Sequence, residues 1–310
     1  MGVPSPSHIV VTDSGLGGLS ICALLERGLR AAGPARGVRL TYVNAWPFED
    51  RGYNDLPDER ERARVFDLAL SRMALMEPDR ILIACNTLSV LYPRTVFSRS
   101  PAAPVLGIVD AGADAFAERL AGEPASSIAL IGTKTTIESG EHRARLVERG
   151  IDPRRIGAAS CHGLAGAIER DVNGPRTAEL IGECAARAVA AAPDGTTLFL
   201  GLCCTHYGYV SVRLLEAAAR LTSRRVDWID PNHRLAARLL ADPRFAGDGG
   251  GSGAAAPQPG GSSTDLVSVE LVSKVTLSET ARAGIARLVE PISPATAGAL
   301  LSYALVPDLF

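Results

Sequence analysis

The stretch Ile81-Leu-Ile-Ala-Cys-Asn-Thr87 decides the fold of this chain. Four apolar residues followed by small polar ones are typical of a buried parallel strand that ends at a crevice. In open α/β sheets, ligands bind just beyond the carboxyl ends of such strands. We therefore expect Cys85 to lie at the mouth of a binding site, beside the amide of Asn86 and the hydroxyl of Thr87.

A second stretch, Thr197-Leu-Phe-Leu-Gly-Leu-Cys-Cys-Thr-His-Tyr207, has the same character. It is another apolar run, and it ends in Cys204 and Thr205. Because both runs carry a cysteine just after the strand, we expect the two cysteines to face each other across one small substrate.

The two halves of the chain repeat the same landmarks at the same spacing. Asp13 precedes Cys85 by 72 positions, and Thr133 precedes Cys204 by 71. Each half begins with a strand, a small polar turn and a helix. We predict an α/β fold with two pseudosymmetric, doubly wound parallel-sheet domains that face each other across a cleft. Residues 1–107 and 226–310 would form the first domain, with the C-terminal segment folding back, and residues 108–225 the second.

Strand and helix patterns alternate along the whole chain, which is typical of a parallel sheet. Strands are expected at 9–11, 38–43, 128–131, 156–159, 226–229 and 266–272, and at the two runs quoted above, and the second half is expected to begin near residues 105–110. Helices are expected at 19–29, 59–76, 137–150, 177–192, 231–240 and 278–289. Residues 245–264 are rich in Gly, Ser, Ala and Pro, so we expect a mobile loop there.

The composition excludes several classes of protein. The chain has 310 residues, 46% of them hydrophobic, and a formal net charge of -2, which indicates no nucleic-acid or membrane-surface partner. No apolar run approaches the roughly 18 residues of a membrane span. The N-terminus lacks a secretory signal pattern. We therefore expect a cytoplasmic protein with reduced cysteines, and leave open whether it forms a homodimer.

The two cysteines suggest proton transfer at a carbon. Inverting a carbon next to a carboxylate takes one group that accepts a proton and another that donates one. A thiol can do both, because its reference pKa of roughly 8.5 lies near working pH. Asp13 is the candidate partner of Cys85, and His206 that of Cys204. Hydrogen-bond donors for the developing negative charge would come from Ser14, Asn86, Thr87 and Thr205.

Other uses of these residues are weaker. The turn Thr12–Gly18 is not a dinucleotide fingerprint, because Ser20 stands where a third glycine is needed. Cys203, Cys204 and His206 could bind a metal together with Cys161 and His162, but adjacent cysteines are poorly spaced for a tetrahedral site. We assign Cys184 to the core. The segments that carry His8, His142 and His233 are expected to be exposed, and these histidines receive no role.

Five short segments resemble the aspartate/glutamate racemase family. They are Asp13–Gly18, Ala84–Thr87, Gly132–Ser139, Cys204–Tyr207, and Cys161 with Glu169 eight residues later. They occur in both halves and in the family's order, so the resemblance covers most of the chain.

The resemblance implies racemisation of an amino acid without cofactor or metal, with a role in cell-wall peptidoglycan synthesis. It implies that Cys85 and Cys204 are the paired acid and base, Cys85 assisted by Asp13 and Cys204 by His206 and Glu169. It implies that the substrate's amino and α-carboxylate groups and the cleft are lined by Ser14, Asn86, Thr87, Thr133, Thr136 and Thr205.

The side-chain pocket departs from the family pattern. Asn44 stands where the family has Asp, and Gly52-Tyr53-Asn54 stands for its Pro-Tyr-Gly, so Tyr53 and Asn54 would meet the distal end of the substrate. We expect an acidic amino acid, glutamate, as substrate. The alternatives are a related isomerase or decarboxylase of another α-substituted carboxylic acid, and a catalytically silent binding protein with the same fold.

Overall fold

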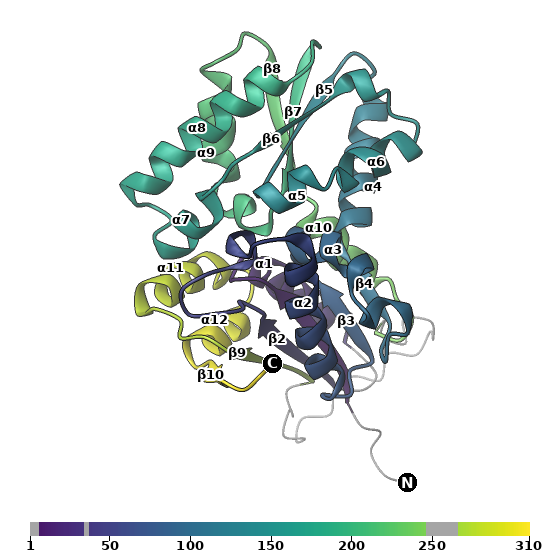
Figure 1. Cartoon of the computed structure of the whole chain (residues 1–310), viewed down its shortest axis with the longest axis vertical. Coiled ribbons are helices and arrows are strands. Elements are labelled where there is room, and N and C mark those ends of the chain that lie inside the picture. The colour runs from purple at the N-terminus through teal and green to yellow at the C-terminus, as the bar shows by residue number, and fades with distance from the viewer. Residues whose placement is uncertain (1–5, 34–36, 246–265) are drawn as a thin grey trace, which may run out of the picture.

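Two α/β domains, each with a parallel sheet, make up the computed structural model, which describes residues 6–33, 37–245 and 266–310. Figure 1 shows one domain above the other. The first sheet has the order β10 (Ala304–Leu305), β9 (Val267–Ser273), β2 (Val38–Asn44), β1 (Ser7–Asp13), β3 (Arg80–Ile83), β4 (Val105–Gly107). The second has the order β6 (Ile156–Ser160), β5 (Ser127–Gly132), β7 (Thr197–Cys203), β8 (Arg225–Ile229).

The two sheets repeat one topology. The order β2-β1-β3-β4 in the first domain corresponds strand by strand to β6-β5-β7-β8 in the second, and all these pairs are parallel. The predicted pair of pseudosymmetric α/β domains is confirmed. Since β1 corresponds to β5 and β3 to β7, the residues that follow these strands occupy equivalent places.

Helices cover both faces of each sheet. The first domain has α1 (Leu19–Ala32), α2 (Glu59–Ala74), α3 (Asn86–Leu91), α10 (Asn232–Leu240), α11 (Glu279–Val289) and α12 (Pro294–Leu301). The second has α4 (Ile108–Gly122), α5 (Lys134–Glu138), α6 (Glu141–Glu148), α7 (Leu164–Arg170), α8 (Pro175–Ala191) and α9 (Ser211–Ala219). Short 3₁₀ turns lie at Tyr53–Asp55, Tyr92–Arg94, Phe97–Arg99, Pro153–Arg155 and Thr205–Val210.

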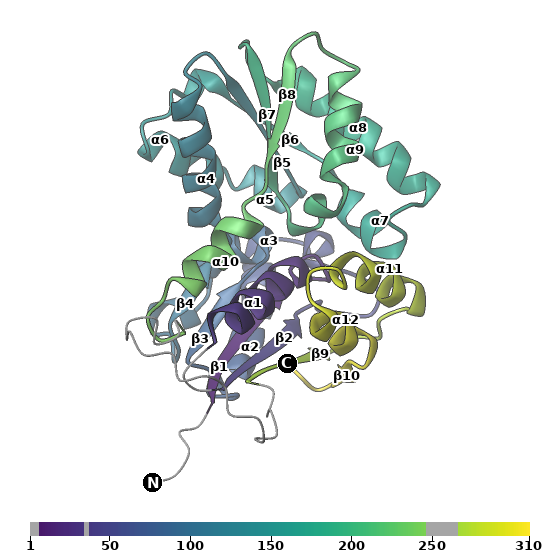
Figure 2. The same cartoon turned by 180° about the vertical axis from the view of Figure 1, so that it is seen from behind.

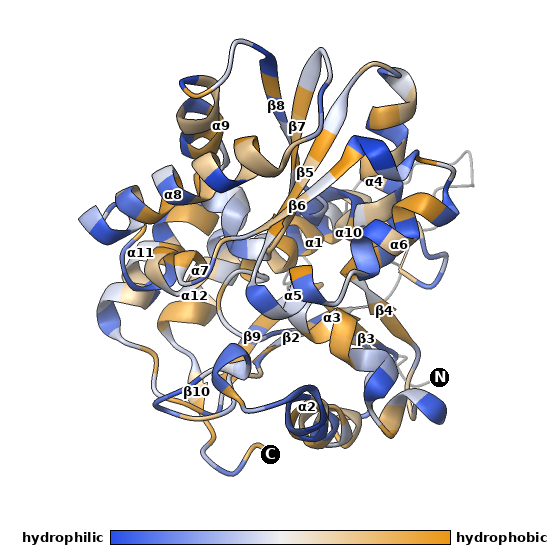
Figure 3. Ribbon diagram, turned by 45° about the horizontal axis from the view of Figure 1, so that its top comes forward, coloured by the Kyte–Doolittle hydropathy of each residue, from blue (hydrophilic) through white to orange (hydrophobic). Residues whose placement is uncertain are grey.

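The continuous apolar strands are explained by burial on both faces. In β1, Ile9 and Val11 pack in the cluster that contains α1, whereas Val10 packs in the cluster that contains α2. In β5, Ile131 packs toward α7 and α8, whereas Leu130 packs toward α4 and α6. Each such side chain contributes roughly 1.5–3 kcal/mol of transfer free energy. Figure 3 shows β5 largely in orange between helices that carry blue outer turns.

The C-terminal segment returns to the first domain. β9 pairs with β2 from Val38 opposite Val267 to Asn44 opposite Ser273, and α11 and α12 pack beside α1 (Figure 2). The boundary expected at residue 226 falls inside β8, which pairs with β7 of the second sheet. Residues 226–229 thus continue the second sheet, while the rest of the domain assignment stays a prediction.

Three expectations differ from the structure. The helix expected over 137–150 is divided into α5 and α6 at Gly140, whose φ of +69° is left-handed. Cys161 and Cys184, expected to be reduced, form a disulfide that joins the loop between β6 and α7 to helix α8. His142 is buried rather than exposed, as is His8.

Two further expectations concern the loop before β9 and membrane-spanning segments. Residues 246–265, which include most of the expected mobile loop, lie outside the described residues. Among the helices of the described ranges, none is long and apolar enough to cross a membrane.

Candidate active site

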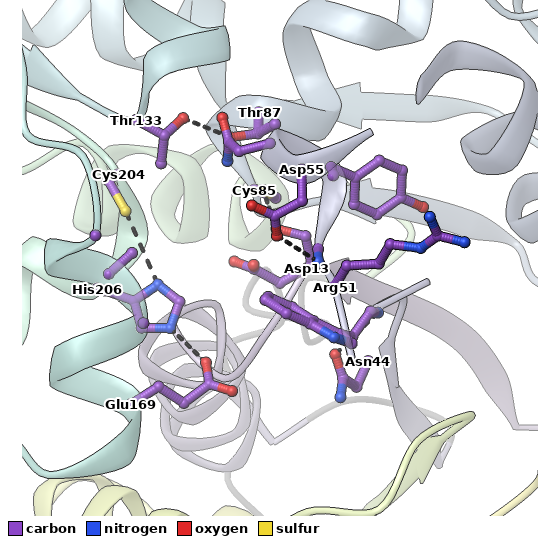
Figure 4. Close-up of a pocket in the computed structure, with 18 of the residues that line it drawn as sticks. Asp13, Asn44, Arg51, Asp55, Cys85, Thr87, Thr133, Glu169, Cys204 and His206 are labelled. Atoms are coloured by element: carbon purple, nitrogen blue, oxygen red, sulfur yellow. Dashed lines mark hydrogen bonds and ion pairs between the residues drawn. The ribbon is translucent and has the colours of Figure 1, made fainter. Parts of the chain in front are cut away.

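A cavity of about 480 Å³ lies where the carboxyl ends of the two sheets meet. Both domains line it: β1 and β3 deliver Asp13 and Cys85 to one wall, and β7 delivers Cys204 to the other. Figure 4 shows Cys204, His206 and Glu169 as a connected row on one side of this cavity. Nearly all the predicted site residues line the cavity, namely Asp13, Ser14, Tyr53, Asn54, Cys85, Asn86, Thr87, Thr133, Glu169, Cys204, Thr205 and His206.

Cys85 lies at the N-terminus of α3, where its sulfur accepts a hydrogen bond. The Leu88 backbone N–H lies 3.5 Å from Sγ, and the Ser14 hydroxyl lies 3.2 Å from the same atom. Burial, followed by the negative charge of Asp13, raises the pKa of the Cys85 thiol. Cys85 therefore stays protonated at neutral pH and is suited to donate a proton.

Asp13 ends β1 and is buried beside Cys85. Its Oδ2 accepts a hydrogen bond of 2.9 Å from the hydroxyl of Thr205, which belongs to the opposite wall. Its Oδ1 has no hydrogen-bond partner in the described parts of the chain. Burial raises the pKa of Asp13, although the charge on His206 and the Thr205 hydrogen bond act in the opposite direction.

Cys204 belongs to a chain of three groups. Its sulfur lies 3.8 Å from Nδ1 of His206, and Nε2 of His206 lies 2.7 Å from Oε2 of Glu169. Burial alone would lower the pKa of His206, but the Cys204 sulfur and the Glu169 carboxylate outweigh it and hold that pKa well above its usual range. The imidazole is therefore charged at neutral pH, and it lies beside the Cys204 sulfur.

The glycine turn after β1 brings the two walls together. A Cβ on Gly17 would lie 2.3 Å from Oγ1 of Thr205 and 2.8 Å from the backbone nitrogen of His206. The Leu16 N–H donates to Glu169 Oε2 at 2.8 Å, across the two domains. These glycines thus permit close approach between the domains. This packing role explains why the turn is rich in glycine, and no nucleotide site is needed to explain it.

Hydroxyl groups join the domains at another edge of the cavity. The Thr87 hydroxyl lies 2.9 Å from that of Thr133 and 3.1 Å from that of Thr136, which are themselves 3.0 Å apart. Thr133 lines the cavity, whereas the buried Thr136 lies behind it and supports the other two. Asn54 Oδ1 accepts from the Thr135 N–H at 3.1 Å, so the loop after β2 also contacts the second domain.

The part of the cavity around the predicted Tyr53 also includes residues that we did not predict. Tyr53 buries its ring against Phe66, with centroids 6.4 Å apart. The Gly52 N–H donates to the Asp55 carboxylate at 2.8 Å. Other residues of this part of the cavity are Trp46, Arg51, Leu277 and Ala281. No local motif marks them, because the long loop after β2 and the returning C-terminal segment bring them there.

The His, Cys, Asp and Glu side chains that line the cavity are spread around it rather than grouped as ligands of one ion in the described ranges. Within the described ranges, no cluster of three or more His, Cys, Asp and Glu side chains could hold a metal ion. Cys161, one of the ligands considered for a metal, is bonded to Cys184 instead.

Known proteins resemble this chain over most of its length. The family model for Asp/Glu/hydantoin racemase matches residues 9–239. The glutamate racemase of Brucella canis is 30% identical over 234 residues, covering 74% of this chain and 78% of that protein. The glutamate racemase of Granulibacter bethesdensis is 30% identical over 236 residues, covering 74% of this chain and 76% of that protein.

Solved structures share the fold. A glutamate racemase isoform from Bacillus anthracis superposes with a TM-score of 0.65 at 18% identity, covering 96% of this chain and 95% of its own. The glutamate racemase of Francisella tularensis, solved in complex with D-glutamate, has a TM-score of 0.63 at 19% identity, covering 92% and 94%.

Proposed function

Because the chain belongs to the Asp/Glu/hydantoin racemase family and is an amino-acid racemase, we propose that it interconverts L- and D-glutamate by a two-cysteine mechanism without a cofactor. One observation carries this proposal. Cys85 and Cys204 follow equivalent strands of two similar domains and line the same cavity. Such a pair can reach one carbon from opposite sides.

In the proposed reaction, Cys204 accepts the proton and Cys85 returns one. The thiolate of Cys204, held beside the His206 imidazolium, takes the α-proton from one enantiomer, and the carbon keeps the electron pair. The Cys85 thiol donates its proton to the opposite face of that carbon. One turnover leaves Cys204 as the thiol and Cys85 as the thiolate. The other enantiomer reacts from this form by the reverse sequence, or Cys204 releases a proton to solvent while Cys85 takes one up, so that no proton is gained or lost overall.

The polar groups around the two sulfurs are suited to hold the substrate. Ser14, Asn86, Thr87 and Thr205 surround the cavity with hydroxyl and amide groups, and fixed donors stabilise the charge that develops on the α-carboxylate. The hydrogen bond from Thr205 to Asp13 keeps both walls in register while this charge forms.

The finer parts of the proposal concern substrate and setting. Glutamate as substrate is supported by the names of the relatives and by the D-glutamate complex of the Francisella protein. A cytoplasmic enzyme that supplies D-glutamate for peptidoglycan stays a prediction, and the homodimer stays an open alternative.

One assay tests the reaction and the substrate together. The purified chain is incubated with D- and L-glutamate and with D- and L-aspartate in deuterated water. We expect loss of optical rotation with glutamate, accompanied by deuterium at the α-carbon. Absence of both signals with all four compounds would contradict the proposal. A panel of α-substituted carboxylic acids would then separate a related isomerase or decarboxylase from a silent binding protein.

A further inference from the structure

A buried histidine of the second domain contacts an amide of the first. His142, in the first turn of α6, is 2% exposed, and its Nε2 lies 3.0 Å from Oδ1 of Asn86 in α3. Its ring also packs near Phe116, with centroids 6.3 Å apart. Asn86 is adjacent to Cys85 and lines the cavity, whereas His142 does not reach it. The contact therefore links the cavity wall to the interior of the other domain.

The hydrogen-bonding roles at this contact follow from the charge of the ring. Burial lowers the pKa of His142 to about 4, so the imidazole is neutral at pH 7 and carries one N–H. The carbonyl oxygen of Asn86 can only accept, so the proton lies on Nε2. Nδ1 of His142 then keeps its lone pair, and it has no partner among the described residues.

The other end of the Asn86 side chain is a donor in need of an acceptor. Asn86 is 2% exposed, and its Nδ2 has no hydrogen-bond partner in the described parts of the chain. Leaving a buried amide donor unsatisfied is costly, and such groups are usually retained for a function. A ligand oxygen in the cavity would satisfy it.

We propose that His142 is a positioning residue, which holds the Asn86 carbonyl so that the Asn86 amide N–H groups point at the α-carboxylate of the substrate. The identity of that ligand rests on the proposed function. Without the histidine, the Asn86 amide could rotate and turn its oxygen toward the carboxylate. The partial negative charge of that oxygen would then repel the negative charge of the carboxylate.

Kinetics of four variants, three single and one double, test this role. In His142→Phe the ring remains but the donor is lost, so we expect the KM for glutamate to rise and kcat/KM to fall by about 10- to 100-fold, the loss typical of one hydrogen bond to a charged group. His142→Gln offers an amide N–H to Asn86 and should recover part of this loss. Adding His142→Phe to Asn86→Ala should change KM no further.

A second buried histidine provides the control. His8 is 5% exposed, its Nε2 lies 2.8 Å from Thr41 Oγ1, and it sits near the start of β1, far along the strand from Asp13. His8→Phe should lower Tm without raising KM. If His142→Phe behaves in the same way, or if its effect multiplies with that of Asn86→Ala, the proposal is wrong.

A measurement independent of turnover keeps this inference separate from the proposed function. ¹⁵N NMR of histidine-labelled protein at pH 7 should show His142 as the neutral Nε2–H tautomer, with an Nε2–H signal that shifts in Asn86→Ala. The Nδ1–H tautomer would overturn the inference even if the wild type racemises glutamate. Conversely, a wild type that racemises no amino acid would refute the proposed function while this spectrum still tests the His142–Asn86 contact.

Discussion

The two walls of the cavity share one backbone layout but differ in charge. Cys85 and Cys204 each follow a central strand, β3 or β7, of equivalent sheets. Around Cys85 lie a hydroxyl and a buried carboxylate, Ser14 and Asp13, and the pKa of the thiol is raised. Beside Cys204 lies an imidazole whose pKa is raised and which pairs with Glu169.

This difference shows that fold symmetry need not give chemical symmetry. A racemase must accept substrates of opposite handedness, yet its resting state needs one acid and one base. Burial and the carboxylate of Asp13 favour the thiol form of Cys85, whereas a charged imidazole lies beside Cys204. Under the proposed two-cysteine mechanism, the free enzyme would first remove the α-proton from the enantiomer that places this proton at Cys204.

The largest expected effect comes from removing either sulfur. A hydroxyl cannot replace a thiol as acid or base near neutral pH, so Cys85→Ser and Cys204→Ser should each lower racemisation by about 10³-fold or more. Optical rotation with L- and D-glutamate measures this loss. Cys203→Ser is the matched control, because Cys203 is fully buried next to Cys204 and packs in the core beside Phe199. Full activity in either of the first two variants would contradict the two-cysteine mechanism.

The two walls can be separated by isotope exchange. His206→Asn removes the charge beside Cys204. Deuterium should therefore replace the α-proton without inversion about 10- to 100-fold more slowly in the enantiomer whose α-proton faces Cys204. Asp13→Asn should slow exchange in the opposite enantiomer. Mass spectrometry of each recovered enantiomer measures both rates. Equal slowing of both enantiomers in both variants would show that the walls are not distinct.

The smallest expected effect is on stability against pH. His206 has a raised folded-state pKa, so its contribution to stability is fully present below its unfolded pKa of 6.5 and is lost as pH rises through the folded value. Urea unfolding should therefore show that the stability difference between wild type and His206→Asn shrinks from pH 6 to pH 9. The change is about 1.4 kcal/mol for each pKa unit of the folding shift.

His8 gives the control with the opposite sign. Burial lowers the pKa of His8, so its contribution to stability grows as pH rises from the folded value to the unfolded value of 6.5, and is constant above it. The stability difference between wild type and His8→Asn should therefore widen as pH rises toward 6.5 and stay nearly constant up to pH 9, where the difference for His206→Asn shrinks. If the difference in unfolding free energy between wild type and His206→Asn does not change with pH, the imidazole of His206 is not charged beside Cys204.

Much of this architecture could be predicted because local patterns carry it. Apolar runs that end in Cys85 and Cys204 place both residues at carboxyl ends of strands, and parallel strands bring those ends to one edge. The repeat from Asp13 and Thr133 then brings two such edges together. The side chains that line the cavity at these strand ends follow from the same pattern.

The remainder depends on contacts between distant segments. His142 could not be assigned, because its burial comes from α4 and α3 rather than from its own helix pattern. Thr136 was expected to line the cleft but supports Thr87 and Thr133 from behind, since only helix geometry decides which of two nearby hydroxyls faces inward. The Cys161–Cys184 bond depends on how α8 packs beside the loop that follows β6.

The return of β9 to the first sheet has a consequence for synthesis on the ribosome. The strands β5 to β8 leave the ribosome before β9, so the second domain can complete its sheet while the first cannot. Until residues 267–273 emerge, the outer edge of β2 has no partner, and an open strand edge invites pairing with other chains. The late-synthesised strand β9 thus protects the edge of the early strand β2. A chain that ends prematurely after α10 should therefore aggregate.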